Sequence, residues 1–276
     1  MRKLAVWLFM VFMLAGGGTS FGGGAAFDTC RIETLSNCGT SSGGGRTSPD
    51  QLNSRSYASA KVHTELAGMY YERAQLGTAL GEIDLALQAE RNYAPAYNVR
   101  GLIHMALRED KNAEEDFQQS LRLDENNSEA HNNYGWFLCQ RGHEKESIPH
   151  FMAALKNPLY ETPERAYLNA GLCSRKAGNN PDAEEFLQRA LQLQPGLPQA
   201  LLAMAELNFA NGDYVNAKKY FARFAEKNDN MTAEQLWLAV RIERKAGDRN
   251  SEASYGTQLR KRYPDARETQ LFMQGE

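Results

Sequence analysis

The side chains of this 276-residue chain that could do chemistry are few: five histidines and four cysteines. The histidines are His63, His104, His131, His143 and His150. None has the HExxH spacing that places two imidazoles on one face of a helix as zinc ligands. His104 and His131 fall at positions that the repeat described below fills with packing residues. We therefore expect histidines of the core or the surface, with no metal and no cofactor.

Catalysis by hydroxyl or carboxyl side chains also finds no support in the sequence. Ser, Asp and Glu residues are plentiful, but they map onto helix faces or turns of the repeat, and no separate segment remains to form a catalytic pocket. We therefore do not expect an enzyme or its regulatory subunit. The formal net charge of −3 provides no basic stripe, so the composition argues against nucleic-acid binding as well.

The first residues have the composition of a targeting segment. Arg2 and Lys3 precede the apolar run AVWLFMVFMLA at residues 5–15, which is too short to remain across a bilayer. A mature anchor helix is the alternative, but the glycines at 16–18 end the apolar run too soon for it. We predict a signal peptide over residues 1–17 and export of the chain to the periplasm.

The sequence LAGG at residues 14–17 is similar to the end of a bacterial lipoprotein signal, Leu-Ala-Gly-Cys. Gly17 stands where the lipidated cysteine would be, so no thioether to a diacylglyceryl group can form there. Cys30 and Cys38 lie far from the apolar run and are poor substitutes. Either the chain is released by cleavage near residues 22–26, or it lacks the anchor of such lipoproteins.

Residues 18–56 have the composition of a linker, rich in Gly, Ser, Thr and Asn and poor in large apolar side chains. Such a segment buries too little surface to offset its ordering entropy, which predicts a flexible tether. Its glycine runs lack the strand, the lysine and the helix start that a phosphate-binding loop needs.

From about residue 60 the chain repeats itself with a period of 34 residues. A small side chain recurs at Ala67, Gly101, Gly135, Gly171 and Ala205. A second small side chain follows twelve residues later, at Ala79, Ala113, Ser147, Ala183 and Ala217. Four positions further on the side chain is bulky, at Ile83, Phe117, Phe151, Leu187 and Phe221. Two antiparallel helices approach closely only where small side chains face each other, and the bulky side chain then fills the remaining gap.

This spacing is typical of tetratricopeptide (TPR) repeats, each of which is a helix–turn–helix unit. It predicts an all-α TPR superhelical solenoid over residues 57–276. Six repeats are expected, at about 60–93, 94–127, 128–161, 164–197, 198–231 and 232–265. Gly142, Gly178 and Gly212 are expected at the turns. The interval between the third and fourth copies is 36 residues. The last copy is degenerate, and its small-residue register is expected to slip by about one position. Its basic end suits a solubilising cap and comprises Lys245, Arg249, Arg260, Lys261 and Arg262.

Two cysteines fall on neighbouring first helices of the predicted repeats. Cys139, in the segment YGWFLCQRG, is at repeat position 12, and Cys173 is at position 10 of the next copy. First helices of adjacent repeats pack side by side, so the two thiols are expected at nearly the same height. In an oxidising compartment they can form a disulfide, contributing roughly 3–4 kcal/mol for a loop of about 35 residues. The alternative is two separate buried thiols acting as small hydrophobes. For Cys30 and Cys38 we assign no pairing.

Three segments are more specific than a generic repeat: YGWFLCQRG, NPLYETPERAYLNAGLCSRKAGN and SYGTQLRKRYPDARETQLFMQGE. Together they resemble the PilF/PilW family of type IV pilus biogenesis proteins, over roughly residues 60–276. The resemblance implies a lipoprotein at the periplasmic face of the outer membrane that acts as a pilotin, helping the pilus secretin to reach that membrane and assemble into its ring. The secretin is then the expected partner, and a monomer the expected state. Gly17 departs from the family and leaves attachment of the N-terminus to the membrane open.

The inward-facing repeat positions predict a groove that binds a partner. In TPR proteins, positions 2, 5, 6, 9 and 12 of each first helix face the concave side. The predicted groove residues are Tyr71, Asn98, Leu102, Met105, Asn132, Asn133, Trp136, Asn169, Leu172, Arg175, Leu202, Glu206 and Phe209. The Lys–Asn pair of clamps that hold a C-terminal carboxylate is absent. A groove of apolar side chains and amides instead suits an extended or helical polypeptide segment.

Several of these assignments have alternatives. Trp136 and Met105 would also fit as ordinary packing between repeats, whereas Asn98 and Asn132 are assigned to the groove because a buried unpaired amide would be costly. The alternative to a pilotin is a general periplasmic TPR adaptor for outer-membrane or cell-wall assembly. The partner's contact with the groove or with the convex back is likewise left open.

Overall fold

The structure, a computed structural model, describes residues 49–275, which form thirteen α-helices and, within this range, no strand. The helices are α1 (Pro49–Glu72), α2 (Leu76–Ala89), α3 (Ala94–Leu107), α4 (Asp110–Leu123), α5 (Ser128–Gln140), α6 (Glu144–Ala154), α7 (Pro163–Lys176), α8 (Asn180–Leu193), α9 (Pro198–Ala210), α10 (Tyr214–Ala225), α11 (Ala233–Ala246), α12 (Arg249–Arg262) and α13 (Arg267–Met273). The predicted signal peptide, Gly17, Cys30 and Cys38 lie outside the described residues. None of the thirteen helices is both long and apolar enough to cross a bilayer.

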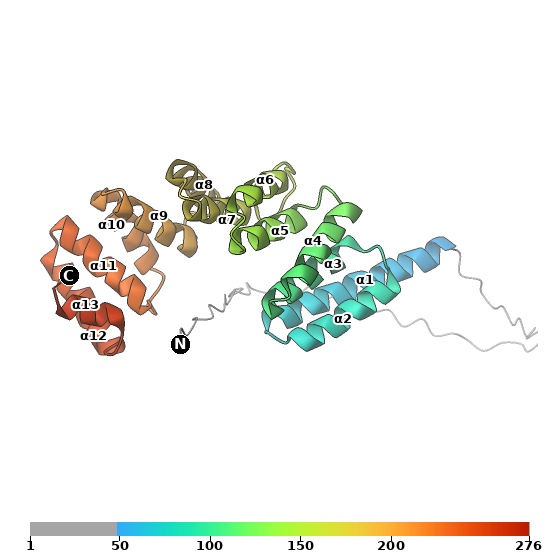
Figure 1. Cartoon of the computed structure of the whole chain (residues 1–276), viewed down its shortest axis with the longest axis horizontal. Coiled ribbons are helices and arrows are strands. Elements are labelled where there is room, and N and C mark those ends of the chain that lie inside the picture. The colour runs from blue at the N-terminus through green and yellow to red at the C-terminus, as the bar shows by residue number, and fades with distance from the viewer. Residues whose placement is uncertain (1–48, 276) are drawn as a thin grey trace, which may run out of the picture. The chain divides into compact units, whose positions relative to one another are not determined.

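Successive helices pair through short turns: α1 with α2, α3 with α4, and so on to α11 with α12 (Figure 1). In the second of the two units described below, first helices also contact the first helices of neighbouring pairs, as α3 contacts α5 and α5 contacts α7. The predicted fold class, an all-α TPR solenoid of helix–turn–helix repeats, is confirmed.

The chain divides into two compact units, one ending at Arg91 and the other beginning at Asn92. In the first unit, α1 packs against α2 and buries Ala67, Ala79 and Ile83 completely. The small side chains of Ala67 and Ala79 let the two helices approach, and the bulky Ile83 fills the remaining gap, as the repeat predicts. The second unit holds α3–α13, and its largest cluster of buried side chains extends from α7 to α12.

Helix α1 begins at Pro49, so the tether prediction is wrong for residues 49–56. Proline is well tolerated in the first turn of a helix, where its missing N–H is not needed. Gln51, Leu52 and Arg55, which follow, are good helix formers. The prediction weighted the scarcity of large apolar side chains and overlooked these helix-forming residues.

Glycine allows the paired helices of the second unit to approach closely. A Cβ atom on Gly101 would lie only 2.8 Å from Cε1 of Phe117, and one on Gly171 would lie 2.7 Å from Cγ of Leu187. Both bulky side chains are completely buried. The small and bulky positions of the repeat therefore meet inside each helix pair, where a larger residue would push the helices apart.

The turns within the pairs share one backbone conformation. Gly142, Gly178 and Gly212 have φ values of 88°, 79° and 81°, in the left-handed region that glycine adopts without a Cβ penalty. Arg108, between α3 and α4, takes the same conformation with a φ of 63°. The helix pair thus requires a residue in the left-handed conformation at this turn, and glycine adopts that conformation at the lowest cost.

The longer interval between the third and fourth repeats is a loop between α6 and α7. Tyr160, only 9% exposed, packs in this loop with Ala154 and Ala166. The hydroxyl of Thr162 donates to Oε1 of Glu129 on α5, at 2.9 Å. The extra residues are therefore anchored by an aromatic ring and a hydrogen bond.

The C-terminal end contains a helix that the sequence analysis did not predict. Helix α13 packs on α11 and α12, and its Phe272 ring occupies the place that a Cβ on Gly256 would take. Arg260, expected to contribute to a basic cap, lies with its Cζ 5.7 Å from the centroid of the same ring. The end of the last repeat is therefore covered partly by helix α13, and not only by charged side chains.

The expected slip of register in the last repeat is correct only for its second helix. Ala239 of α11 follows Ala205 by 34 residues and is completely buried. In α12 the buried residues are Gly256 and Leu259, one position later than the repeat predicts. Phe272 of α13 packs against Gly256 at this shifted position.

Replacing Phe151 by alanine should destabilise the fold by roughly 3–5 kcal/mol, because it removes a fully buried ring that lies against Gly135. Chemical denaturation followed by circular dichroism measures the change. Leu159→Ala is the matched control, since Leu159 is 84% exposed, and it should change the free energy of unfolding by less than about 0.5 kcal/mol. Equal effects of the two substitutions would contradict the packing role of the ring.

Candidate functional site

The predicted groove residues lie on the first helices of the repeats, and all but Tyr71 belong to the second unit. Tyr71 is half-buried on α1 of the first unit, and burial raises the pKa of its hydroxyl. In the second unit, nine of the predicted residues are half-buried, and we call them the first-helix face. They are Leu102, Met105, Trp136, Asn169, Leu172, Arg175, Leu202, Glu206 and Phe209.

The apolar members of the first-helix face are shared between the core and the surface. Leu102 and Met105 pack against the cluster of Phe117 and Tyr134. Trp136 packs against the cluster that contains both described cysteines. Packing between repeats therefore accounts for part of the surface of Met105 and Trp136, and the rest of each side chain remains open to solvent.

Three predicted groove amides are instead buried between neighbouring first helices. Asn133 Nδ2 of α5 donates to Asn98 Oδ1 of α3 at 3.2 Å, and Asn169 Nδ2 of α7 donates to Asn132 Oδ1 of α5 at 3.0 Å. Asn132 is only 1% exposed, and Asn98 and Asn133 are each 8% exposed. The assignment of Asn98, Asn132 and Asn133 as free groove donors is therefore corrected. These amides are buried, and their hydrogen bonds to amides of neighbouring helices offset the cost of burial.

The amide pairs follow the register of the repeat. Each joins position 5 of one first helix to position 6 of the next. At the following step, between α7 and α9, these positions are Leu168 and Ala203, both buried and apolar. The polar pairing thus stops where the largest hydrophobic cluster begins.

The structure brings Cys139 of α5 and Cys173 of α7 together. Their sulfur atoms are 1.98 Å apart and their Cα atoms 5.9 Å apart, a separation typical of disulfides. Phe151 and Ala170 surround the bond, which is buried. It joins neighbouring first helices on either side of the loop that carries Tyr160.

Charged side chains lie on three successive first helices, α7, α9 and α11. Arg175 of α7 forms an ion pair with Glu206 of α9. Arg241 of α11 lies over two aromatic rings, with its Cζ 4.9 Å from the centroid of Phe209 and 5.8 Å from that of Trp237. Burial lowers the pKa of Arg241, and the charge of Glu206 opposes that shift.

The sequence analysis missed Arg241 and Trp237, although a signal for them was present. Because Ala239 keeps the 34-residue interval from Ala205, the positions of the first helix could have been carried into the last repeat. Treating that repeat as a degenerate cap concealed these two residues.

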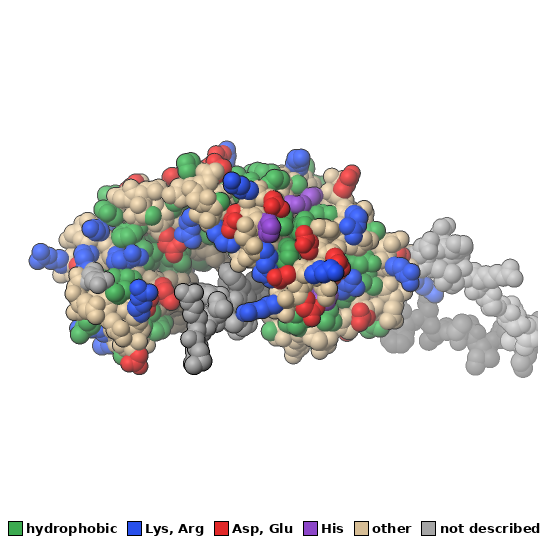
Figure 2. Space-filling view, in the orientation of Figure 1, with side chains coloured by type: hydrophobic (Ala, Val, Ile, Leu, Met, Phe, Trp, Pro, Cys, Tyr) green, Lys and Arg blue, Asp and Glu red, His purple; other side chains and the backbone are tan. Residues whose placement is uncertain are grey.

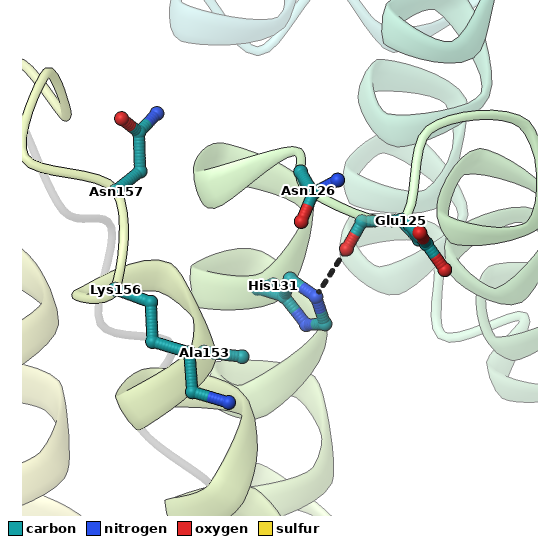
Figure 3. A pocket seen from close by; sticks show the side chains of 6 residues that line it. All are labelled: Glu125, Asn126, His131, Ala153, Lys156 and Asn157. Carbon is teal, nitrogen blue, oxygen red and sulfur yellow. Dashed lines mark hydrogen bonds between the residues drawn. The ribbon is translucent and has the colours of Figure 1, made fainter.

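An open depression of about 520 Å³ lies between the ends of α4, α5 and α6 (Figure 3). The ring of His131 faces into it and is held through Nε2, 3.0 Å from the backbone oxygen of Glu125 (Figure 3). Its Nδ1 lies 3.0 Å from Nδ1 of His150, so one of the two nitrogens must carry the shared proton. Burial and the charge of His131 lower the pKa of His150, which favours a neutral imidazole there.

Charge on the face in view is mixed, with Lys and Arg side chains interspersed among Asp and Glu (Figure 2). Across residues 49–275, no three His, Cys, Asp or Glu side chains gather as a metal site. The first-helix face combines half-exposed apolar side chains, one paired amide and a few charges. Such a surface can hold another polypeptide through side-chain contacts and hydrogen bonds.

Comparison with known proteins agrees with this description. Three family models described as tetratricopeptide repeat match residues 94–127, 117–148 and 174–240. The solved structure of PilW, a widely conserved type IV pilus biogenesis factor, is 32% identical with a TM-score of 0.71, covering 78% of this chain and 98% of that one. The structure of PilF from Pseudomonas aeruginosa is 28% identical with a TM-score of 0.76, covering 80% of this chain and 100% of that one.

The same bacterium's curated type IV pilus assembly protein PilF is 29% identical over 211 residues, which are 76% of this chain and 83% of the relative. The helix pairs and the repeat matches define a tetratricopeptide-repeat protein, a class that mediates protein–protein interaction. Within that class, the chain belongs to the PilF/PilW family of type IV pilus biogenesis proteins.

In protein exported to the periplasm and purified without reductant, Cys139 and Cys173 should be oxidised to the disulfide. Thiol titration of the denatured, unreduced chain should then detect at most two of its four cysteines. Reduction should lower the free energy of unfolding by roughly 3–4 kcal/mol. The Cys139→Ala/Cys173→Ala variant is the control, whose stability should not respond to reductant. Four reactive thiols without reduction would contradict the disulfide.

Replacing Asn133 by alanine leaves Oδ1 of Asn98 buried without its donor, and this should cost about 1–3 kcal/mol. The Asn98→Ala/Asn133→Ala double variant should cost less than the sum of the two single variants, because the orphaned partner is also removed. Urea denaturation of the four proteins completes the cycle. Strictly additive costs would show that the two amides do not depend on each other.

Proposed function

We propose that the chain is a non-enzymatic pilotin of type IV pilus biogenesis, which helps the pilus secretin to reach the outer membrane and assemble into a ring. Membership of the PilF/PilW family carries this proposal, since the chain spans 98% of PilW at 32% identity. The relatives' names state type IV pilus assembly or biogenesis. The secretin and the pilotin role are the further step that we propose.

The first-helix face is the surface proposed to bind the secretin. Leu172, Leu202 and Phe209 are half-exposed and pack on the largest buried cluster, so they form an apolar surface that the core holds in place. A polypeptide segment laid on them removes apolar area from water without requiring the core to rearrange. Such a site binds and releases a partner and needs no covalent step.

The proposed location is the periplasm, at the inner face of the outer membrane. The charged and apolar residues at the start of the chain support export, and a disulfide between Cys139 and Cys173 would persist in an oxidising compartment. Gly17 has no thiol for a thioether-linked lipid, so lipidation of that residue forms no part of the proposed attachment to the membrane. The chain is proposed to act as a monomer.

Deletion of the gene should leave the secretin unassembled or outside the outer membrane, and twitching motility should be lost. Membrane fractionation followed by native electrophoresis of the secretin measures both effects. Reintroduction of the wild-type chain should restore them. A variant with Leu172→Asp and Leu202→Asp should restore them poorly, because two carboxylates on the apolar surface would have to be desolvated by the partner.

The control is a Leu159→Asp/Leu193→Asp variant, which places the same charges on exposed leucines off the first helices. It should restore secretin assembly fully. Normal secretin rings in the deletion strain would contradict the pilotin role. If outer-membrane proteins other than the secretin were then lost, a general periplasmic adaptor would replace it.

A further inference from the structure

Arg241 differs from every other half-buried arginine that the structure describes. Those four arginines each reach a carboxylate: Arg100 pairs with Asp116, Arg141 with Asp110, Arg175 with Glu206, and Arg244 with Glu252. Within residues 49–275, Arg241 forms no such ion pair. Its Nε, like that of Arg141, is buried without a hydrogen-bond partner. Buried charged groups are normally paired, so the missing carboxylate is the feature of Arg241 that calls for an explanation.

The aromatic contacts of Arg241 do not satisfy its donors. A cation–π contact uses the charge of the guanidinium, whereas its N–H groups lie in its plane and are not donated to the rings. Phe209 and Trp237 therefore hold the group in place without meeting its hydrogen-bonding capacity. This arrangement limits the rotamer freedom of a long side chain before any ligand arrives.

The charges around Arg241 leave room for an anion. Glu206 is the acid whose charge acts on the pKa of Arg241, but it already forms an ion pair with Arg175. Two guanidinium groups thus share one carboxylate, and the group of three carries a net positive charge. A second carboxylate would balance that charge and could accept two parallel hydrogen bonds from the terminal nitrogens Nη1 and Nη2 of Arg241, since Nε is buried.

The surface beside Arg241 is apolar. Leu202, Glu206 and Phe209 are spaced four and three residues apart on α9, so they share one side of that helix. Leu202 and Phe209 rest on the largest buried cluster while remaining half-exposed. A ligand that fits both features has an acidic group next to apolar side chains.

We propose that Arg241 binds the carboxylate of an Asp or Glu side chain within a partner polypeptide, whose neighbouring apolar side chains lie on Leu202 and Phe209. This inference rests on the proposed function only in taking the ligand to be a polypeptide. A side chain is preferred to a chain terminus because positions 5 and 9 of α9 are Leu202 and Glu206, so the Lys–Asn pair that would grip a terminal carboxylate is absent.

The first experiment selects peptides on the full-length chain and does not involve the secretin. A random library is displayed with each peptide's C-terminus fused to the phage coat protein, so that no peptide offers a free carboxyl end. Binders selected on the wild-type chain should be enriched in Asp or Glu flanked by apolar residues. Selection on Arg241→Gln should lose this enrichment, and Arg189→Gln should keep it, because Arg189 is an exposed arginine on the second helix α8.

The selected peptide is then synthesised with its acid and with the matching amide. The wild-type chain should bind the acid about 10- to 100-fold more tightly than the amide, the range for a hydrogen bond to a charged group. Arg241→Gln should bind both forms with the weaker affinity, while Arg241→Lys, which keeps the charge without the planar fork, should recover part of the difference. Thermal unfolding of each variant checks that the fold is retained.

Three results would overturn the inference: no acidic enrichment on the wild-type chain, the same enrichment on Arg241→Gln, or a preference for synthetic peptides with a free C-terminus whose internal acid is dispensable. Capture of the purified secretin separates this inference from the proposed function. If the wild-type chain selects acidic peptides through Arg241 but does not capture the secretin, the proposed function fails and the inference stands. If it captures the secretin equally with and without Arg241, and the peptides show no acid preference, only the inference fails.

Discussion

In the second unit, the contact between a glycine on one helix and a bulky side chain on its partner determines how closely the helices pack. The bonds between neighbouring first helices depend on that packing. Because Gly101 has no Cβ, Phe117 can lie directly against α3. The same ring reaches the next pair of helices, with its centroid 5.9 Å from that of Tyr134 and 5.7 Å from that of Phe137. One aromatic side chain therefore holds its own repeat together and joins it to the following one. That double contact brings neighbouring first helices within reach of each other, and only then can amides and thiols on adjacent helices form bonds.

The features that were predictable from the sequence are mainly those that recur, together with a few distinctive segments. The positions of Gly135 and Phe151, repeated in other copies, indicated helix pairs and their contact, and YGWFLCQRG with the two other distinctive segments indicated the family. Two features that occur once, α13 and the start of α1, were missed. Helix α13 depends on Phe272 meeting Gly256, a pairing that no other copy contains. The start of α1 depends on modest helix propensities that composition alone does not reveal.

The amides show why a repeat position does not by itself identify a binding residue. Asn98 and Asn132 stand at positions that face the concave side in many TPR proteins, and burial of an unpaired amide would indeed be costly. The structure avoids that cost by pairing each with an asparagine one repeat further on. Their role is to hold first helices in register by polar contacts near one end of the unit, while apolar side chains do so near the other. The first-helix face is consequently a surface whose members support the fold and remain partly available to a partner, and its residues cannot be altered for binding without attention to packing.

The covalent bond between α5 and α7 has a mechanical consequence. A pulling force applied to the ends of the chain would pass from Cys139 directly to Cys173, bypassing the 34-residue interval between them. Helix α6 and the loop that holds Tyr160 would then carry no load while helices elsewhere were being drawn apart. The point where the spacing of repeats is irregular, and where a stack of helices would be expected to yield first, is thereby shielded from tension.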